Sequence, residues 1–151
     1  MSGYTELKNY LGKHENRNTK ELNDFIGKYV KEWRGFSVQS TPWCAAIWNA
    51  AERAAGLAGN GKLNARAALT YGTCVYDRNK KLGSWKDGAR GDVVIFERGG
   101  SSWQGHIAYI DGIEQDKQFN ILIRTLGGNQ SDSVSIGWYP LARVLGIRRS
   151  R

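Results

Sequence analysis

Cysteine is scarce in this chain, with only Cys44 and Cys74 among 151 residues. No hydrophobic export segment precedes them, because the amino-terminal stretch MSGYTELKNYLGKHENRN is polar. Two thiols without an export signal argue against a fold held together by disulfides. No run of about 18 apolar residues occurs either, so we expect no membrane-spanning segment.

Acidic residues are outnumbered in this protein. Lys and Arg total 22 against 14 Asp and Glu, a net charge of +8. This balance favours an anionic partner, such as nucleic acid, an acidic polysaccharide or a membrane surface. The basic residues cluster only briefly, at 78–81 and 148–151, and neither zinc-finger spacing nor an RNA-binding aromatic motif is present. We therefore expect general attraction to a polyanion and no specific recognition of nucleic acid.

The composition is that of a folded globular protein, with 40% hydrophobic and 24% charged residues. No internal repeat, low-complexity tract or linker interrupts the chain. A length of 151 residues is compatible with a single domain. We expect one domain over residues 1–151, acting as a monomer.

The first half of the sequence has helical periodicity. Residues 19–33 carry apolar side chains at steps of three and four, with Thr19 as the expected N-cap and Gly35 as the stop. A second helix is expected from an N-cap at Thr41 and a first helical residue at Pro42. Its small side chains would let it pack closely on a sheet, and a weaker helix is expected at 63–71.

After Gly83 the pattern changes to short β-rich runs separated by Gly, Asp, Asn and Ser. Five such runs occur, GDVVIFER, HIAYIDGI, FNILIRTL, SVSIGWY and VLGIRR. Their spacing predicts an antiparallel sheet or half-barrel of about five strands. Helices followed by strands predict an α+β fold.

Cys44 lies in the first turn of the second expected helix. The positive end of a helix dipole and its unpaired N–H groups favour a thiolate, the form in which cysteine is a nucleophile. His106 opens a strand directly after a glycine and could supply the base. The alternative is a small apolar cysteine beside a structural histidine, and this pair alone leaves both interpretations open.

Asn129 follows the end of the next strand. Antiparallel pairing brings the end of one strand beside the start of its neighbour, so we expect Asn129 close to His106. Its amide would accept the ring N–H and orient the imidazole, the third role in a catalytic triad. The alternative is an ordinary asparagine in the Gly-rich turn that begins at Gly127.

Several of these segments together resemble a known family. In order they are TPWCAAIWNAAERAAG, GDVVIF, GHIAYIDG, LGGNQSDSVSI and a closing LGIRR. The chain is similar over about residues 41–149 to the CHAP and NlpC-type cysteine peptidases of bacteria and their phages, and within them to small phage-associated members with Pro-Trp-Cys-Ala, Gly-His and Gly-Gly-Asn-Gln blocks. The resemblance implies a papain-like fold with N-terminal helices packed on the sheet, and hydrolysis of amide bonds in peptidoglycan.

The resemblance also assigns roles. Cys44 matches the nucleophile, His106 the base and Asn129 the orienting residue. The chain departs from many relatives in having Gly127 where they carry an acidic residue. Many relatives also have a signal peptide or a wall-binding module, and we expect neither here. Some relatives bind calcium through an Asp-rich loop, but DGIEQDK lacks the alternating spacing, so we expect no metal and no cofactor.

Further residues around the expected site have provisional roles. The Cys44 N–H and the side chain of Gln39 are candidates for the oxyanion hole, although Gln39 could equally be a solvated loop residue. Trp43 and Trp103 could form walls of a substrate groove, although tryptophan at such positions is more often part of the core. Cys74 is expected to be structural, and a Cys44–Cys74 disulfide would abolish activity.

These features predict a peptidoglycan hydrolase, an endolysin that acts as an N-acetylmuramoyl-L-alanine amidase or a stem-peptide endopeptidase. By analogy with the family, it would be made in the host cytoplasm and reach the wall after release through a holin-type pore. A related amidase used as an interbacterial toxin or a virion-associated lysin would use identical chemistry. A non-enzymatic basic module that binds polyanions is a third interpretation.

Overall fold

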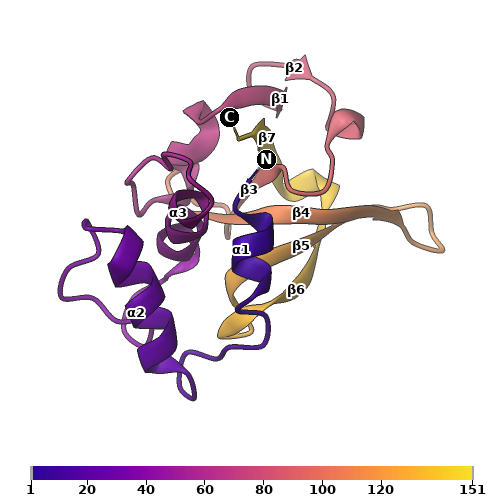
Figure 1. The fold of residues 1–151 in the computed structure, drawn as a ribbon. Coiled ribbons are helices and arrows are strands. Elements are labelled where there is room, and N and C mark those ends of the chain that lie inside the picture. The colour runs from indigo at the N-terminus through magenta and orange to yellow at the C-terminus, as the bar shows by residue number, and fades with distance from the viewer. Residues whose placement is uncertain (1, 151) are drawn as a thin grey trace.

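The computed structural model describes residues 2–150, in which three α-helices precede the sheet (Figure 1). They are α1 (Tyr4–Lys8), α2 (Thr19–Tyr29) and α3 (Cys44–Ala54), followed by the 3₁₀ helices η1 (Ala65–Thr70), η2 (Trp85–Asp87) and η3 (Leu141–Arg143). No helix within residues 2–150 is both long and apolar enough to cross a membrane. The weak helix expected at 63–71 is the 3₁₀ helix η1, and α1 was not predicted from the sequence.

One antiparallel sheet contains all the strands. They are β1 (Thr73–Asp77), β2 (Leu82–Gly83), β3 (Val93–Glu97), β4 (Gly105–Gln115), β5 (Ile121–Gln130), β6 (Ser133–Pro140) and β7 (Val144–Arg149), in the order β2-β1-β7-β3-β4-β5-β6. The α+β class is confirmed, but the sheet has seven strands rather than five. Each of the five predicted runs forms a strand. The additional strands β1 and β2 form a short hairpin beside β7.

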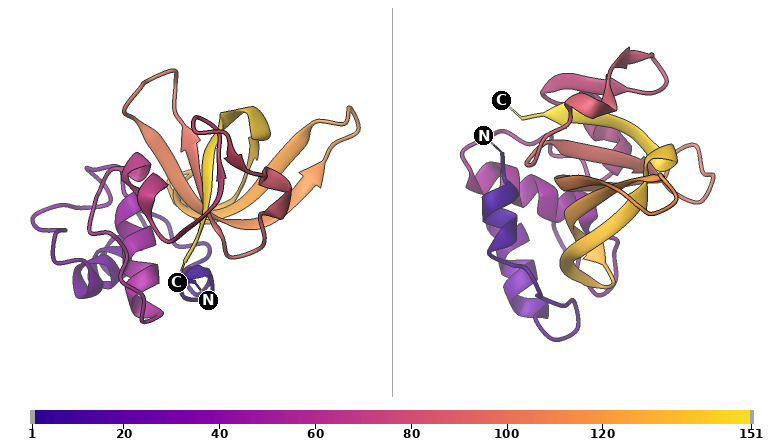
Figure 2. Two further views of the ribbon diagram at one scale, coloured as in Figure 1. Left: turned by 90° about the horizontal axis from the view of Figure 1, so that it is seen from above. Right: turned by 90° about the vertical axis from the view of Figure 1, so that its right-hand side faces the viewer.

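The sheet separates two hydrophobic clusters. One cluster joins the helices to alternate residues of the central strands, including Ile95, Ile107 and Tyr109. The other lies on the opposite face of the curved sheet (Figure 2) and includes Phe96 and Ala108. Because side chains alternate between faces along a strand, His106 shares the face of Phe96 and Ala108, and Ile107 points toward α3.

Helix α3 packs directly on β4 and β5 because its contact face is made of small residues. Ala46, Ala50 and Ala51 are completely buried, as expected from the sequence. The predicted start was wrong, because the helix begins at Cys44 rather than at Pro42, and its N-cap is Trp43, with no side-chain cap. Cys44 is therefore the first helical residue, and the first main-chain bond is donated by Ile47 N–H to Trp43 C=O.

A buried carboxylate near the end of α3 ties the two ends of the chain together. Glu52 is completely buried and accepts hydrogen bonds from the Gly3 N–H at 2.5 Å, the Tyr109 hydroxyl at 2.7 Å and the Ser150 hydroxyl. The two termini accordingly lie close together in both views of Figure 2. Three donors on one carboxylate compensate the loss of its hydration, which is otherwise costly inside a protein.

The packing of α3 on β5 is testable at Gly128. A Cβ atom there would lie 2.5 Å from Ile47 Cγ2 and 2.7 Å from Trp43 Cζ3, too close for two buried side chains to accommodate without a shift. We expect Gly128→Ala to lower the free energy of unfolding by about 1–3 kcal/mol, measured by chemical denaturation. The control is Gly27→Ala in α2, where a Cβ meets nothing within 4 Å. The control should be neutral or slightly stabilising, and an equal loss in both variants would contradict the close approach.

Candidate functional site

The amino end of α3 presents the Cys44 thiol to the sheet. As the first helical residue, Cys44 lies where backbone N–H groups have no partner within the helix. The N–H groups of Ala45, of Cys44 itself and of Ile107 in β4 all act on the sulfur and favour its anion. The thiol is thus held between the helix and the main chain of β4, just after His106.

A cavity of about 350 Å³ opens beside Cys44. Its wall is formed by three segments, the turn before α3, the approach to η1 and the loop between β3 and β4. The lining residues are Thr41, Pro42, Cys44, Leu63, Asn64, Ala65, Arg98, Trp103, Gln104 and Gly105. The nucleophile candidate therefore faces a space large enough for part of a ligand.

His106 is the second residue of β4, and its side chain lies on the face of the sheet that points away from α3. His106 is only 3% exposed, and its ring packs beside the rings of Phe96 and Tyr139 at centroid distances of 6.3 and 5.3 Å. Its Nε2 lies 2.9 Å from Oε1 of Gln130 at the end of β5. This buried contact orients the imidazole.

The contacts of Gln130 determine which nitrogen of His106 carries the proton. Gln130 Nε2 lies 2.7 Å from the carbonyl of Ser135, which can only accept, so the amide NH₂ must face Ser135. Oε1 therefore faces His106 and also accepts from the Thr125 hydroxyl at 2.9 Å. Since Oε1 is an acceptor, His106 must donate from Nε2. The neutral ring then keeps its lone pair on Nδ1.

The expectation that Asn129 would contact the ring is wrong, because a bulge intervenes. Gly127 pairs with Ser135 and Gln130 pairs with Ser133, so β5 carries one extra residue between these pairs. An extra residue reverses the alternation of faces. Gln130 thereby takes the face on which a regular strand would place Asn129. Asn129 adopts a left-handed φ of 58° and lines a separate depression.

Burial controls the ionisation of both candidate residues. Loss of solvent lowers the pKa of His106 to about 4, although the Gln130 contact opposes this. Burial also raises the pKa of the Cys44 thiol, and this outweighs the backbone N–H groups that favour the thiolate. The predicted thiolate at the helix terminus is therefore not the resting form. At neutral pH the site holds a thiol and a neutral imidazole.

Cys44 and His106 lie on either side of the main chain of β4. Gly105 lines the cavity with Cys44, and the Ile107 N–H acts on the sulfur, so both neighbours of His106 contact the thiol or its cavity. Within residues 2–150, the side-chain hydrogen bond of the His106 ring is made to Gln130, and none joins it to the thiol. Catalytic hydrogen bonds are often long before substrate is bound.

Of the other three predicted site residues, one lines the Cys44 cavity and two do not. Trp103 is 66% exposed and lines the Cys44 cavity, and its role as a wall of a substrate groove stays a prediction. Trp43 does not line it in the described part of the chain, because its ring is buried in the core and donates to Glu15 Oε1 at 3.1 Å. Gln39 is exposed and donates from Nε2 to Asn16 Oδ1 at 3.1 Å, beside the depression that Asn129 lines.

The expected oxyanion donor Gln39 is thus not brought to the Cys44 cavity. Cys74 is half-buried in β1, and both cysteines are free thiols. Among residues 2–150 no group of three His, Cys, Asp or Glu side chains could hold a metal ion.

Arg66 is a positioning residue that the sequence did not reveal. Its Nε donates to the Gln104 carbonyl at 2.6 Å and its Nη2 to the Ser101 carbonyl at 2.5 Å. Two carbonyls on one guanidinium hold the loop that carries Trp103 against η1. An isolated arginine has no pattern in sequence that would indicate this role.

No known protein family, curated protein or solved structure matches this chain.

The buried imidazole predicts how stability depends on pH. His106 has a pKa of about 4 in the folded protein, below its usual 6.5, so as pH falls below 6.5 the unfolded chain binds a proton that the folded chain does not. The free energy of unfolding should decrease between pH 6.5 and 4, by about 3 kcal/mol in total.

Denaturant titration at several pH values measures this effect in wild type and in His106→Gln. We expect the difference in unfolding free energy between the two proteins to change over this interval and to be constant above pH 7. Parallel curves across the whole range would contradict the buried neutral imidazole.

Proposed function

We propose that this protein is a papain-like cysteine hydrolase that cleaves an amide bond of peptidoglycan. The observation that carries the proposal is the placement of a thiol and of a neutral imidazole with a defined tautomer beside β4. Cys44 opens α3 beside a cavity, and the Gln130 amide leaves the lone pair of His106 on Nδ1. A neutral base with a defined tautomer is what a neutral thiol needs for nucleophilic attack.

In the proposed acylation step the thiol proton passes to His106 Nδ1. The sulfur of Cys44 attacks the carbonyl carbon, and the oxygen gains negative charge beside the Cys44 N–H at the positive end of α3. Nδ1 then protonates the leaving nitrogen as the C–N bond breaks, which leaves a thioester. Nδ1 is the ring nitrogen required, because Nε2 is occupied by Gln130.

Hydrolysis of the thioester repeats these transfers with water. His106 Nδ1 takes a proton from the attacking water, the C–S bond breaks and the Cys44 sulfur recovers its proton. During both steps the imidazolium is stabilised by the dipole of the Gln130 carbonyl oxygen. The amide is held in place by the Thr125 hydroxyl, which donates to its oxygen, and by the Ser135 carbonyl, which accepts from its nitrogen.

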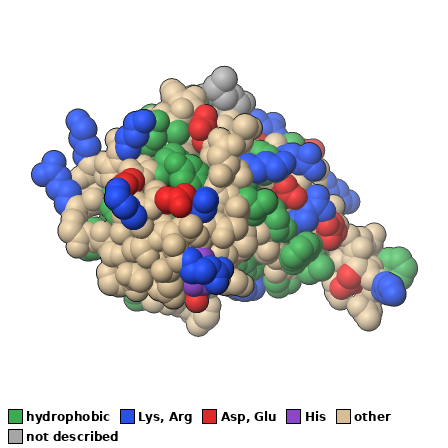
Figure 3. Space-filling model, turned by 60° about the horizontal axis from the view of Figure 1, so that its bottom comes forward, with side chains coloured by type: hydrophobic (Ala, Val, Ile, Leu, Met, Phe, Trp, Pro, Cys, Tyr) green, Lys and Arg blue, Asp and Glu red, His purple; other side chains and the backbone are tan. Residues whose placement is uncertain are grey.

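The assignment of peptidoglycan rests on the sequence. The ordered blocks from TPWCAAIWNAAERAAG to LGIRR resemble the CHAP and NlpC-type family, and the net charge of +8 favours contact with an anionic envelope. On the face drawn in Figure 3, Lys and Arg side chains are scattered among acidic and neutral ones instead of forming one patch. This distribution suits general attraction to a polyanion better than sequence-specific binding of nucleic acid.

The decisive test is digestion of purified sacculi by wild type and by Cys44→Ala, with the loss of turbidity as the measurement. We expect wild type to clear the suspension and the variant to be inactive, since the variant lacks the thiol that forms the thioester at the cavity. Mass spectrometry of the fragments then identifies the amide bond that is cut. Equal clearing by both proteins would contradict cysteine catalysis, and binding without clearing by either would favour a non-enzymatic polyanion-binding module.

The roles of Gln130 and Asn129 are separated by a matched pair of neighbouring variants. Gln130→Ala removes the partner of the His106 ring, and we expect kcat/KM to fall on the order of 10²-fold, the scale of general-base catalysis. Asn129→Gly keeps the left-handed φ of 58° and removes only the side chain, so its activity should stay close to wild type.

The pH profile distinguishes orientation of the base from simple structural damage. Gln130→Glu puts a carboxylate beside the imidazole, which should raise the pKa of His106 and move the acidic limb of kcat/KM to higher pH. If Asn129→Gly were the impaired variant and Gln130→Ala the active one, Asn129 would be the orienting residue.

A further inference from the structure

Arg98 is an unpaired cation at the Cys44 cavity. It follows β3, is exposed to solvent, and lines the cavity together with Cys44. Within residues 2–150 its guanidinium has no hydrogen-bond or ion-pair partner, whereas the neighbouring Arg66 and Arg143 are both bound to main-chain carbonyls. A free guanidinium beside a nucleophile is available to a ligand.

The backbone around Arg98 is built as a tight turn. Gly99 and Gly100 have left-handed φ values of 58° and 73°, which glycine adopts without steric cost, and the Ser101 N–H donates to the Arg98 carbonyl at 3.1 Å. The following residues are fixed to η1 through Arg66. The turn therefore begins at a strand and ends at an anchored loop, and this keeps Arg98 at the rim of the cavity.

The positive charge of Arg98 interacts electrostatically with the residues of the candidate site. It acts on the Cys44 thiol, on the His106 imidazole and on Tyr139, and it favours the anionic form of the thiol. No acidic side chain is among the residues that line the cavity in the described part of the chain. An anion that enters this space meets an uncompensated positive charge within the field of the nucleophile.

A second donor lies on the same wall. Asn64 accepts the Arg66 N–H through its Oδ1 at 2.9 Å and so caps η1. With the oxygen used in this way, the Asn64 NH₂ group remains as a donor at the cavity. Leu63, Pro42 and Trp103 supply apolar surface around these polar groups. A planar group with two acceptors and an apolar stem fits this combination.

From this arrangement we propose that Arg98 forms an anion subsite which binds a carboxylate of the substrate close to the scissile amide. The inference rests on the proposed function and specifies its substrate class as stem peptides with a free carboxylate in place of a carboxamide at that position. Arg98 would be a specificity-determining residue, since it binds a carboxylate of the substrate and does not contact the atoms of the scissile amide.

The first experiment needs no hydrolysis. Cys44 is alkylated with iodoacetate, an anion, and with iodoacetamide, its neutral isostere, and the rates are followed by mass spectrometry of the modified peptide. We expect Arg98→Gln to lower the ratio of the iodoacetate rate to the iodoacetamide rate by about fivefold to tenfold, equivalent to about 1–1.4 kcal/mol. The rate ratio at Cys74 in the same samples is the internal reference.

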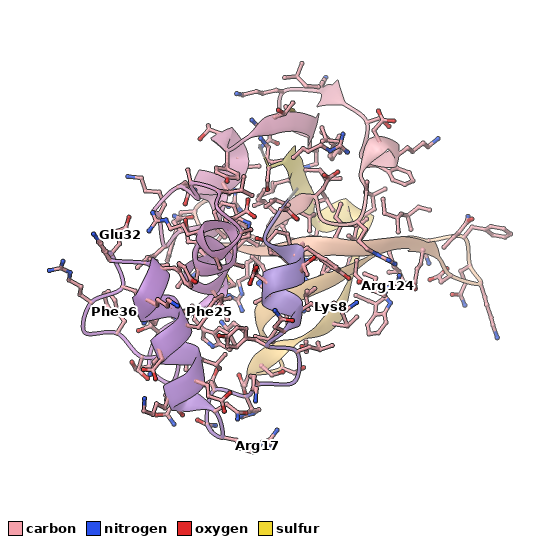
Figure 4. All side chains as sticks on the ribbon, viewed as in Figure 1. Lys8, Arg17, Phe25, Glu32, Phe36 and Arg124 are labelled. Carbon is pink, nitrogen blue, oxygen red and sulfur yellow. The ribbon has the colours of Figure 1, made fainter. Side chains whose placement is uncertain are left out.

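A matched control removes the same charge elsewhere. Arg17 precedes α2, projects from the lower edge of the molecule (Figure 4) and is not among the residues that line the Cys44 cavity. Arg17→Gln should leave the ratio at Cys44 unchanged. An unchanged ratio in Arg98→Gln, or an equal fall in both variants, would overturn the anion subsite whatever the outcome with peptidoglycan.

The second experiment tests the substrate class. Sacculi are digested as isolated and after their carboxylates have been converted to carboxamides with carbodiimide and ammonium ions. Wild type should digest the untreated sacculi about tenfold faster, and Arg98→Gln should digest both at similar rates.

Equal digestion of both preparations by wild type would overturn the inference and leave the proposed function intact. Digestion of neither, together with a normal alkylation result, would contradict the proposed function and leave the anion subsite at Cys44 supported.

Discussion

The close contact between α3 and the sheet is the constraint on which the rest of this structure depends. Alanines on the helix and Gly128 on β5 remove the side-chain bulk that would otherwise hold the two layers apart. The amino end of α3 consequently reaches the start of β4, so that Cys44 lies against the Ile107 N–H. The same packing brings Glu52 to the two ends of the chain, where it accepts bonds from Gly3 and Ser150.

Burial has opposite consequences for the two candidate catalytic groups and makes them compatible. It raises the pKa of the thiol and lowers the pKa of the imidazole, so neither group is charged before substrate binds. Burial removes the water that would accept the ring N–H of His106, and the oxygen of the Gln130 amide takes its place as acceptor. The proposed chemistry is therefore general-base activation of a thiol, in which charge develops only during the reaction.

Much of the fold could be predicted from periodicity alone. The five β-rich runs after Gly83 all form strands, and α2 and α3 appear where apolar residues recur at helical spacing. The short elements α1, β1 and β2 were missed, because segments of two to five residues carry too few periods to be recognised. The start of α3 was misplaced by two residues because Thr41 followed by Pro42 fits the pattern of an N-cap and a first helical residue.

The candidate site shows the boundary between sequence and tertiary structure most clearly. The sequence by itself determined that Cys44 lies in the first turn of a helix and that His106 lies at the start of a strand, since local spacing and glycine or proline neighbours specify such positions. Only the tertiary structure decided that Gln130 and not Asn129 meets the imidazole, because one extra residue in β5 reverses which side chains share a face. It also decided the ionisation of the pair and the position of Arg98 at the cavity, since burial and long-range proximity are properties of the packed chain.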